Sequence, residues 1–300
     1  MFVPSRTESE ILLALYRYSL LTIDQLTALL HLERKTLYQA FHNLKEKGWV
    51  EPLPLGFIKR HVKGWTLTKN GMEVAFGLTK EYRSRPMRQP PSLGGQAGHL
   101  YGSNQFFVHL IKESLFRPRG EGLIEWIGMR DAGNRYTVTD QKGKRTTPVR
   151  PDGIGTYRFS DHSETTFHVE YDTGSEHLWV IHNKLWQYAD VLKQFWSDIT
   201  LANVLFITRE HPRSLRVLEL WRDMNEEVFR RQPVPAVWTA TEQSLLEQGS
   251  FGPVWMGIGG QGSFDDFPRL EGRTDDGMIP LGKQTREHPF SNRTTRKNGP

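Results

Sequence analysis

The sequence predicts an α+β protein of two modules: a winged helix-turn-helix first, and then a mixed β-sheet flanked by helices. Three amphipathic helical segments followed by two strand-like segments occupy residues 1–80. From residue 99 the expected order is helix, strand, hairpin, helix, strand, helix, strand, which suits a sheet covered by helices. A length of 300 residues also fits two domains of ordinary size better than one.

The N-terminal module shows the start and stop signals of short helices. A first helix is expected from Thr7, with acidic residues near its positive end, and a second from Thr22. A third helix covers about 33–47 and ends at Gly48, the residue that favours a helix C-terminus. Strands are expected at 49–51 and 64–68, with a wing at 52–63 between them and a further helix capped by Thr68.

Basic charge is concentrated in the first part of the chain. Residues 1–90 contain 14 Lys and Arg against 8 Asp and Glu, a net charge of +6, whereas the remaining 210 residues contain 25 against 26. Cationic charge confined to one module indicates a polyanionic partner. Ordinary surface solubility is the alternative explanation.

The third helix and the wing carry side chains suited to double-stranded DNA. A helix of this kind lies in the major groove, where amide and basic side chains reach base edges, while wing cations contact phosphates. The candidate DNA-binding residues are Arg34, Lys35, Tyr38, Gln39, His42 and Lys45 on the helix and Lys59, Arg60 and Lys63 on the wing. A protein-interaction module with a solvated helix face is the alternative.

Two further boundaries follow from composition. Residues 81–98 are rich in Pro, Gly and Arg and predict a basic linker. Residues 99–256 then form the second module. Residues 257–300 have little apolar content, and we expect them to be a largely disordered tail.

Acidic side chains gather in the second module. Residues 167–172 alternate apolar and polar side chains as a strand does, so Glu170 and Asp172 point to the same face. Asp152 stands in a Pro-Asp-Gly turn before a strand at 155–159, from which it can fold back onto that face. Crowded carboxylates repel one another and are tolerated best around a hard cation.

This stretch resembles a known family. Arg150-Pro151-Asp152-Gly153, the run Val-Glu-Tyr-Asp-Thr-Gly-Ser-Glu at 169–176, and Lys184-Leu185 with Tyr188 resemble the replication-relaxation family of plasmid and mobile-element proteins. That family pairs a winged helix with a PD-(D/E)XK nuclease-like domain. The resemblance therefore implies a nuclease-like fold for residues 99–256.

The resemblance also implies a metal-dependent nuclease site, with Asp152, Glu170, Asp172 and Lys184 as its catalytic residues. Asp152, Glu170 and Asp172 would bind Mg²⁺ or Mn²⁺, which would activate a water and neutralise charge on the scissile phosphate. The superfamily places its lysine two residues after the strand acid, where this chain has Asp172, so Lys184 on the following helix is the expected substitute. A cap on the turn that follows is the alternative role for Asp172, and the choice is left open.

Two other side chains have alternative roles. Tyr188 either packs or contacts a phosphate, or it attacks DNA as the tyrosine of a relaxase does. Glu113, on the helix expected at 99–116, either adds a carboxylate to the metal or faces water.

The favoured interpretation is an enzyme that binds plasmid or mobile-element origin DNA and nicks it with a divalent metal. Because the usual lysine is missing, the alternative is a non-catalytic replication initiator or transcriptional regulator with a degenerate nuclease-like domain. The expected partners are double-stranded DNA, replication or transfer factors, and a second copy of the chain.

Composition narrows the class of protein further. The sequence has no cysteine, which excludes disulfides and cysteine-bound zinc or iron–sulfur sites. No apolar run approaches the length of a membrane span, and the N-terminus lacks the pattern of a signal peptide. We therefore expect a cytoplasmic protein with no membrane partner.

Overall fold

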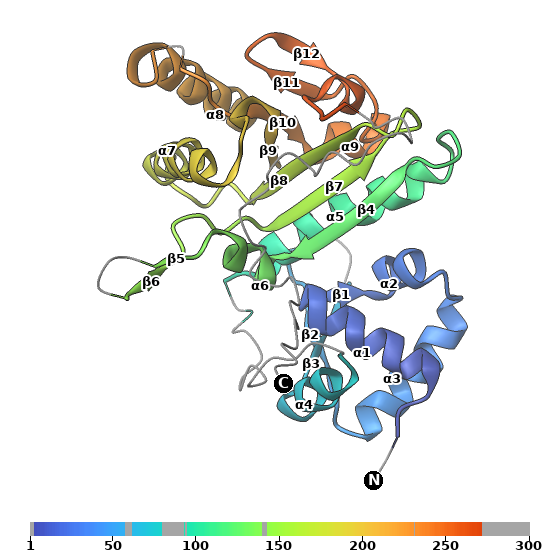
Figure 1. Ribbon diagram of the computed structural model, residues 1–300. Coiled ribbons are helices and arrows are strands. Elements are labelled where there is room, and N and C mark those ends of the chain that lie inside the picture. The colour runs from blue at the N-terminus through green and yellow to red at the C-terminus, as the bar shows by residue number, and fades with distance from the viewer. Residues whose placement is uncertain are drawn as a thin grey trace, which may run out of the picture.

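The computed structural model describes residues 3–57, 62–79, 93, 95–139, 143–230 and 232–271. These residues form two units that pack against each other, a smaller helical unit at the N-terminus and a larger unit built on a mixed sheet (Figure 1). The prediction of an α+β chain with a mixed sheet flanked by helices is confirmed. None of the helices in the described ranges is both long enough and apolar enough to cross a membrane.

The N-terminal unit has the helix and hairpin order of a winged helix. Its β1, β3 and β2 strands form a small antiparallel sheet in that order. The predicted caps are present, because the Thr22 side chain accepts from the Gln25 N–H and the Thr68 side chain from the Gly71 N–H. The elements are α1 (Arg6–Tyr18), β1 (Leu21–Thr22), α2 (Ile23–Leu30), α3 (Arg34–Glu46), β2 (Val50–Pro54), β3 (Lys63–Leu67) and α4 (Lys69–Leu78).

The second unit is organised around a seven-stranded sheet with the order β12-β11-β10-β9-β8-β7-β4 within the described residues. Strands β8, β9 and β10 are parallel, and the remaining pairs are antiparallel. Its larger elements are α5 (Ala97–Ser114), β4 (Gly122–Gly128), β7 (Gly153–Arg158), β8 (Glu164–Asp172), α7 (Leu178–Phe195), β9 (Ala202–Thr208), α8 (His211–Asp223), β10 (Ala236–Thr241) and α9 (Glu242–Gln248). Shorter elements are α6 (Met129–Ala132), a 3₁₀ turn (Gly133–Tyr136), β5 (Val138–Thr139), β6 (Arg145–Thr146), β11 (Trp255–Gly257) and β12 (Gly260–Gly262).

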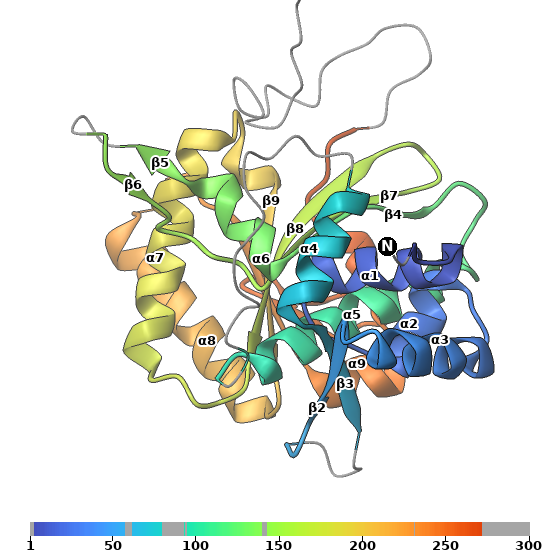
Figure 2. The same cartoon turned by 90° about the horizontal axis from the view of Figure 1, so that it is seen from below.

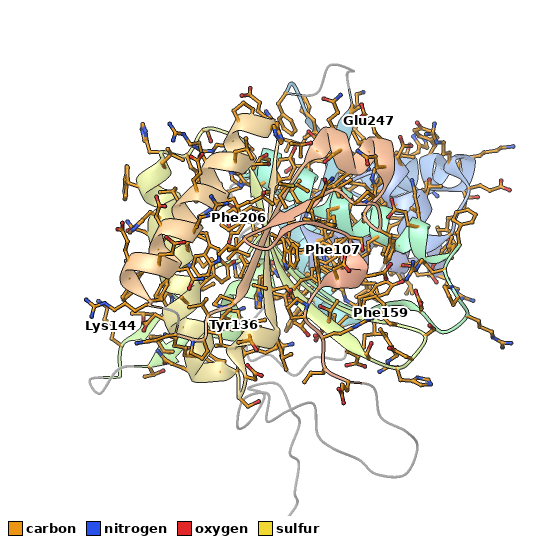
Figure 3. The ribbon with its side chains drawn as sticks, turned by 90° about the horizontal axis from the view of Figure 1, so that it is seen from above. Phe107, Tyr136, Lys144, Phe159, Phe206 and Glu247 are labelled. Atoms are coloured by element: carbon orange, nitrogen blue, oxygen red, sulfur yellow. The ribbon has the colours of Figure 1, made fainter. Side chains whose placement is uncertain are left out.

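Helices cover both faces of this sheet. Helices α7 and α8 lie on one face and α5 and α9 on the other (Figure 2). Phe206 packs in the core on the α7 side, whereas Phe107 packs in the core on the α5 side (Figure 3). Every residue of β9 is buried, as its mostly apolar sequence predicts for a strand covered on both faces.

The expectation of disorder from residue 257 is wrong for residues 257–271. There β12 pairs with β11, and a 3₁₀ turn (Phe264–Asp266) follows. Phe264 and Phe267 are both buried in the core on the α5 side of the sheet. These two aromatic anchors, together with the backbone bridge between Glu164 and Leu270, hold this otherwise polar segment, which average composition does not reveal. Residues 272–300 lie outside the described ranges.

The predicted linker also ends earlier in the sequence than the expected residue 98. Helix α5 starts at Ala97, and Ala97 packs with Leu93, Leu20, Leu55 and Leu100 in a small apolar cluster. The rest of the predicted linker, residues 81–92 and 94, lies outside the described residues.

The two units share a packed junction. The Asn104 side-chain amide on α5 donates to the backbone oxygens of Tyr18, at 3.1 Å, and Leu20, at 2.7 Å. The ring of Trp126 on β4 stacks on Tyr18 with 3.7 Å between centroids. The C-terminal end of α1 therefore packs against α5, the helix whose first turns lie beside Asp152.

Candidate active site

Asp152 is held at the start of β7 by backbone contacts with β8. Its N–H donates to the oxygen of Val169 at 2.9 Å, and its Oδ2 accepts from the N–H of Tyr171 at 2.8 Å. The residue is only 7% exposed. The Pro-Asp-Gly turn thus directs Asp152 back onto the acidic strand, as predicted from the sequence.

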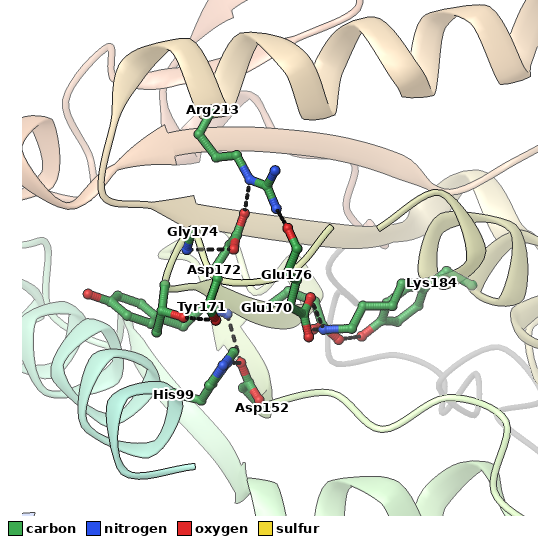
Figure 4. Close-up of polar contacts among 12 residues, drawn as sticks. His99, Asp152, Glu170, Tyr171, Asp172, Gly174, Glu176, Lys184 and Arg213 are labelled. Carbon is green, nitrogen blue, oxygen red and sulfur yellow. Dashed lines mark hydrogen bonds and ion pairs between the residues drawn. The ribbon is translucent and has the colours of Figure 1, made fainter. Parts of the chain in front are cut away.

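His99 contacts the same carboxylate from the first turns of α5. Its Nδ1 lies 3.3 Å from Asp152 Oδ2 (Figure 4). The hydrogen bond to Asp152 raises the pKa of His99, although burial opposes the shift. Sequence analysis missed this residue, because a lone histidine 53 positions before its partner carries no local signal.

Glu170 is engaged through both of its oxygens. Lys184 Nζ donates to Oε2 at 3.0 Å, and the hydroxyl of Tyr188 donates to Oε1 at 2.6 Å. Lys184 and Tyr188 are four residues apart on α7 and share the face that meets β8, as their spacing predicts. The structure therefore brings Glu170 and Lys184 together.

The Lys184 ammonium group also reaches Glu176. The second ion pair measures 2.9 Å and joins the turn after β8 to α7. Burial by itself lowers the pKa of Lys184, but the carboxylates of Glu170, Glu176 and Asp152 together raise it above its ordinary value. Lys184 is therefore charged at every pH at which the protein would work.

Burial dominates the titration of Glu170. It raises the pKa of this carboxyl group to about 7, and the nearby charge of Asp152 adds to the shift, while Lys184 opposes it. A carboxyl group with such a pKa changes its charge near neutral pH, which is a property of functional sites.

Asp172 has contacts different from those of Asp152 and Glu170. Its Oδ2 accepts from Arg213 Nε at 2.5 Å, and its Oδ1 accepts from the Gly174 N–H at 2.8 Å. Arg213 also donates to the backbone oxygen of Glu176. Asp172 therefore caps the turn after β8, which is the alternative left open by the sequence.

Asp152 and Glu170 offer oxygen ligands of the kind that Mg²⁺ accepts. The described residues contain no group of three histidines or carboxylates placed to hold a metal ion. Mg²⁺, however, is usually bound through one or two carboxylates, with water and substrate phosphate completing its shell. Asp152 and Glu170 fit that smaller requirement, with Lys184 already paired to one of them.

The positions of Tyr188 and Glu113 do not suit attack on DNA by Tyr188 or metal binding by Glu113. Tyr188 is buried beneath Glu170, and burial raises the pKa of its hydroxyl well above the ordinary value. Such a group is a poor nucleophile, and its hydroxyl donates to Glu170 Oε1. Glu113 accepts from the Ser250 N–H at 2.7 Å near the far end of α5, about 21 Å along the helix from His99.

The candidate DNA-binding side chains of α3 line one exposed helix face. All six are exposed, and Arg34 and His42 also face carboxylates of Asp24 and Glu46, at 2.5 and 3.3 Å. Lys63 is exposed at the start of β3. Lys59 and Arg60 lie outside the described residues.

These observations define an α+β protein in which a helix-and-hairpin unit is packed beside a mixed sheet that carries a buried acid–lysine cluster. The family model named Replication-relaxation matches residues 12–203, which is more than half of the chain. The protein belongs to the replication-relaxation family, and its role is related to replication or relaxation. No curated protein matches the chain.

One solved structure is similar over a short segment. It is a mutant of MarR from E. coli complexed with operator DNA, at 27% identity and a TM-score of 0.22. The match covers 23% of this chain and 50% of that one. So low a TM-score does not establish a shared fold.

Proposed function

We propose that the protein binds double-stranded DNA at a plasmid or mobile-element origin and nicks one strand with a divalent metal ion. The observation that carries the proposal is the convergence of Asp152, Glu170 and Lys184 where β7 begins and β8 ends. A turn, an acidic strand and a lysine in that order are the features of a PD-(D/E)XK nuclease-like domain. Family membership supports a role on DNA.

Each residue has a role that follows from its contacts. Asp152 and Glu170 would hold Mg²⁺ or Mn²⁺, and the bound ion would lower the pKa of a water and offset charge on the phosphate. Lys184 would orient that water and stabilise negative charge at the phosphate. His99 keeps the Asp152 carboxylate in position and Tyr188 keeps that of Glu170, so neither needs to touch the substrate.

DNA binding is assigned to α3 and the wing. The six exposed side chains of α3 and Lys63 supply the base-reading and phosphate contacts of a winged helix. Replacing Lys35 and Lys45 with alanine should weaken binding and flatten its dependence on salt, because phosphate contacts release counterions. An unchanged salt dependence would show that these lysines of α3 do not contact DNA phosphates.

The nicking activity is tested with supercoiled plasmid that carries the cognate origin, in the presence of Mg²⁺ or Mn²⁺. We expect nicked circles with the parent protein and a rate at least about 100-fold lower for Asp152→Asn and for Glu170→Gln. Asp172→Asn is the matched control, because it removes a neighbouring carboxylate that is engaged with Arg213. Nicking at the parental rate by both acidic-site variants would end the nuclease proposal.

A non-catalytic DNA-binding protein is the second candidate. The hydrogen bonds of Glu170 favour this candidate, because Lys184 and Tyr188 already donate to both of its carboxylate oxygens. Calorimetry with Mn²⁺ separates the two candidates. Binding to a nuclease site should release a proton near pH 6.5, because the metal displaces the proton that Glu170 carries there. Absence of Mn²⁺ binding, or binding unchanged by Glu170→Gln, would favour the second candidate.

A further inference from the structure

A cavity lies where the N-terminal unit meets the second unit, beside Asp152. Its volume is about 440 Å³, which falls within the range of small-ligand sites. Ser19 contributes from the end of α1, and His99 from the start of α5. Asp152 and Glu176 line it as well, so the cavity is continuous with the acidic cluster.

Arg130, on α6, is an unusual side chain to find on the wall of this cavity. The side chain is 6% exposed, its Nη2 is paired with Asp131 at 2.7 Å, and its guanidinium group lies 3.9 Å above the ring of Tyr16. Its Nε and Nη1 are buried and have no hydrogen-bond partner among the residues that the structure describes. A buried cation with two unsatisfied donors is costly, and an anion in the cavity removes that cost once the guanidinium group turns toward it, because Nε and Nη1 have almost no accessible surface in this arrangement.

Arg150 adds a second cation to the same cavity. Its side chain is exposed, and its stem runs across Gly133, where a Cβ atom would approach the Arg150 Cγ to 3.3 Å. Gly133 also lines the cavity. Arg130 and Arg150 therefore line the cavity together with Asp152 and Glu176.

We propose that this cavity binds a phosphate group of a DNA strand through Arg130 and Arg150, next to the phosphate that would be cut at Asp152. Guanidinium groups match the geometry of phosphate oxygens, and the carboxylates repel the same anion and so keep it on the arginines. The volume accommodates a sugar and base as well as the phosphate. The proposal deepens the proposed function and rests on it for the identity of the ligand as DNA.

The test measures binding of a fluorescein-labelled thymidine tetranucleotide to the full chain by anisotropy, in EDTA so that no metal contributes. We expect Arg150→Ala to weaken binding about tenfold or more, because a charged hydrogen bond is lost. Arg130→Met keeps contact with Tyr16 while removing the donors, and the same loss is expected. Arg222→Ala, which removes an exposed arginine of α8, is the control and should bind as the parent does.

Competition identifies the source of the phosphate. The unlabelled dinucleotide d(TpT) should displace the probe at a concentration at least about tenfold lower than inorganic phosphate requires. Equal potency of the two competitors would overturn the assignment to DNA. Parental affinity in Arg150→Ala would overturn the site itself, even if Arg130→Met proved unstable to thermal unfolding.

The same variants separate this inference from the nuclease proposal. Arginine-dependent binding without plasmid nicking would support the phosphate site and count against the nuclease. Plasmid nicking together with arginine-independent binding would support the nuclease and count against the phosphate site.

Discussion

Lys184 and Glu170 form an ion pair of 3.0 Å in which Glu170 is 3% exposed and the Lys184 side chain is 28% exposed. The pair joins α7 to the acidic strand β8. Breaking such a pair from one side leaves a buried charge without its partner, which is more damaging than removing both members. The stability of this region therefore depends on which member is changed.

We predict that at about pH 8, where Glu170 is ionised in the parent protein, Lys184→Met lowers the free energy of unfolding by about 2 kcal/mol, because Glu170 loses its cation in a buried position. The double variant Lys184→Met with Glu170→Gln should recover at least half of that loss. Urea denaturation of the parent, both single variants and the double variant measures the coupling. A double variant no more stable than Lys184→Met alone would show that the ion pair does not set the stability here.

The raised pKa of Glu170 predicts that the folded protein loses stability as pH rises. The native state holds this proton up to a pH of about 7, whereas the unfolded chain releases it near 4.5. The contribution is complete below pH 4.5 and disappears as pH passes through 7. The unfolding free energy of the parent minus that of Glu170→Gln should therefore fall between about pH 5 and about pH 7.5.

This difference isolates Glu170 from its neighbour. His99, whose pKa is also raised, contributes in the same direction, but it is present in both proteins. Urea midpoints at half-unit intervals of pH measure the two profiles. Parallel profiles across this range would mean that Glu170 is ionised throughout.

Local spacing made part of this site predictable from the sequence. Alternation along the strand predicts the face of Glu170, and the four-residue spacing predicts that Lys184 and Tyr188 share a helix face, whereas the family resemblance implies that Lys184 acts with Glu170. The contacts of His99 and Arg213 join residues 53 and 41 positions apart, and only the packing of α5 and α8 on the sheet creates them. No spacing rule reports such contacts.

Asp172 and Glu170 lie on the same face of β8 but contact different partners. Alternation correctly places it on the same side of β8 as Glu170, and their partners on β9 are Thr208 and Phe206. Side chains two residues apart on a strand are nevertheless about 7 Å apart. At the end of the strand, the following turn and Arg213 take both oxygens of Asp172.

Asp172→Asn should therefore affect stability more than catalysis. We predict a loss of about 2 kcal/mol in unfolding free energy, because the charged hydrogen bonds to Arg213 and Gly174 weaken. Metal-dependent nicking should stay within about threefold of the parental rate, since Arg213 and the Gly174 N–H engage both oxygens of Asp172. A loss of nicking as large as that of Asp152→Asn, with stability unchanged, would return Asp172 to the metal.

The close approach of α5 to β8 rests on Gly102. A Cβ atom at that position would lie 2.2 Å from the ring of Tyr171, which is itself buried. We predict that Gly102→Ala costs about 2 kcal/mol of unfolding free energy, because the helix or the buried ring must shift to make room for the added methyl group. It should also slow nicking, since α5 carries His99 and the Tyr171 N–H holds Asp152.

Gly77→Ala is the matched control for this prediction. Gly77 lies in α4, where a methyl group added to its Cα would meet no described atom within 4 Å. There the change should stabilise the protein by about 0.5 kcal/mol, because alanine favours a helix and restricts the unfolded chain. Thermal and urea unfolding of both variants compares the two effects directly. If Gly102→Ala were as harmless as Gly77→Ala, the packing of α5 against Tyr171 would not be what positions the acidic site.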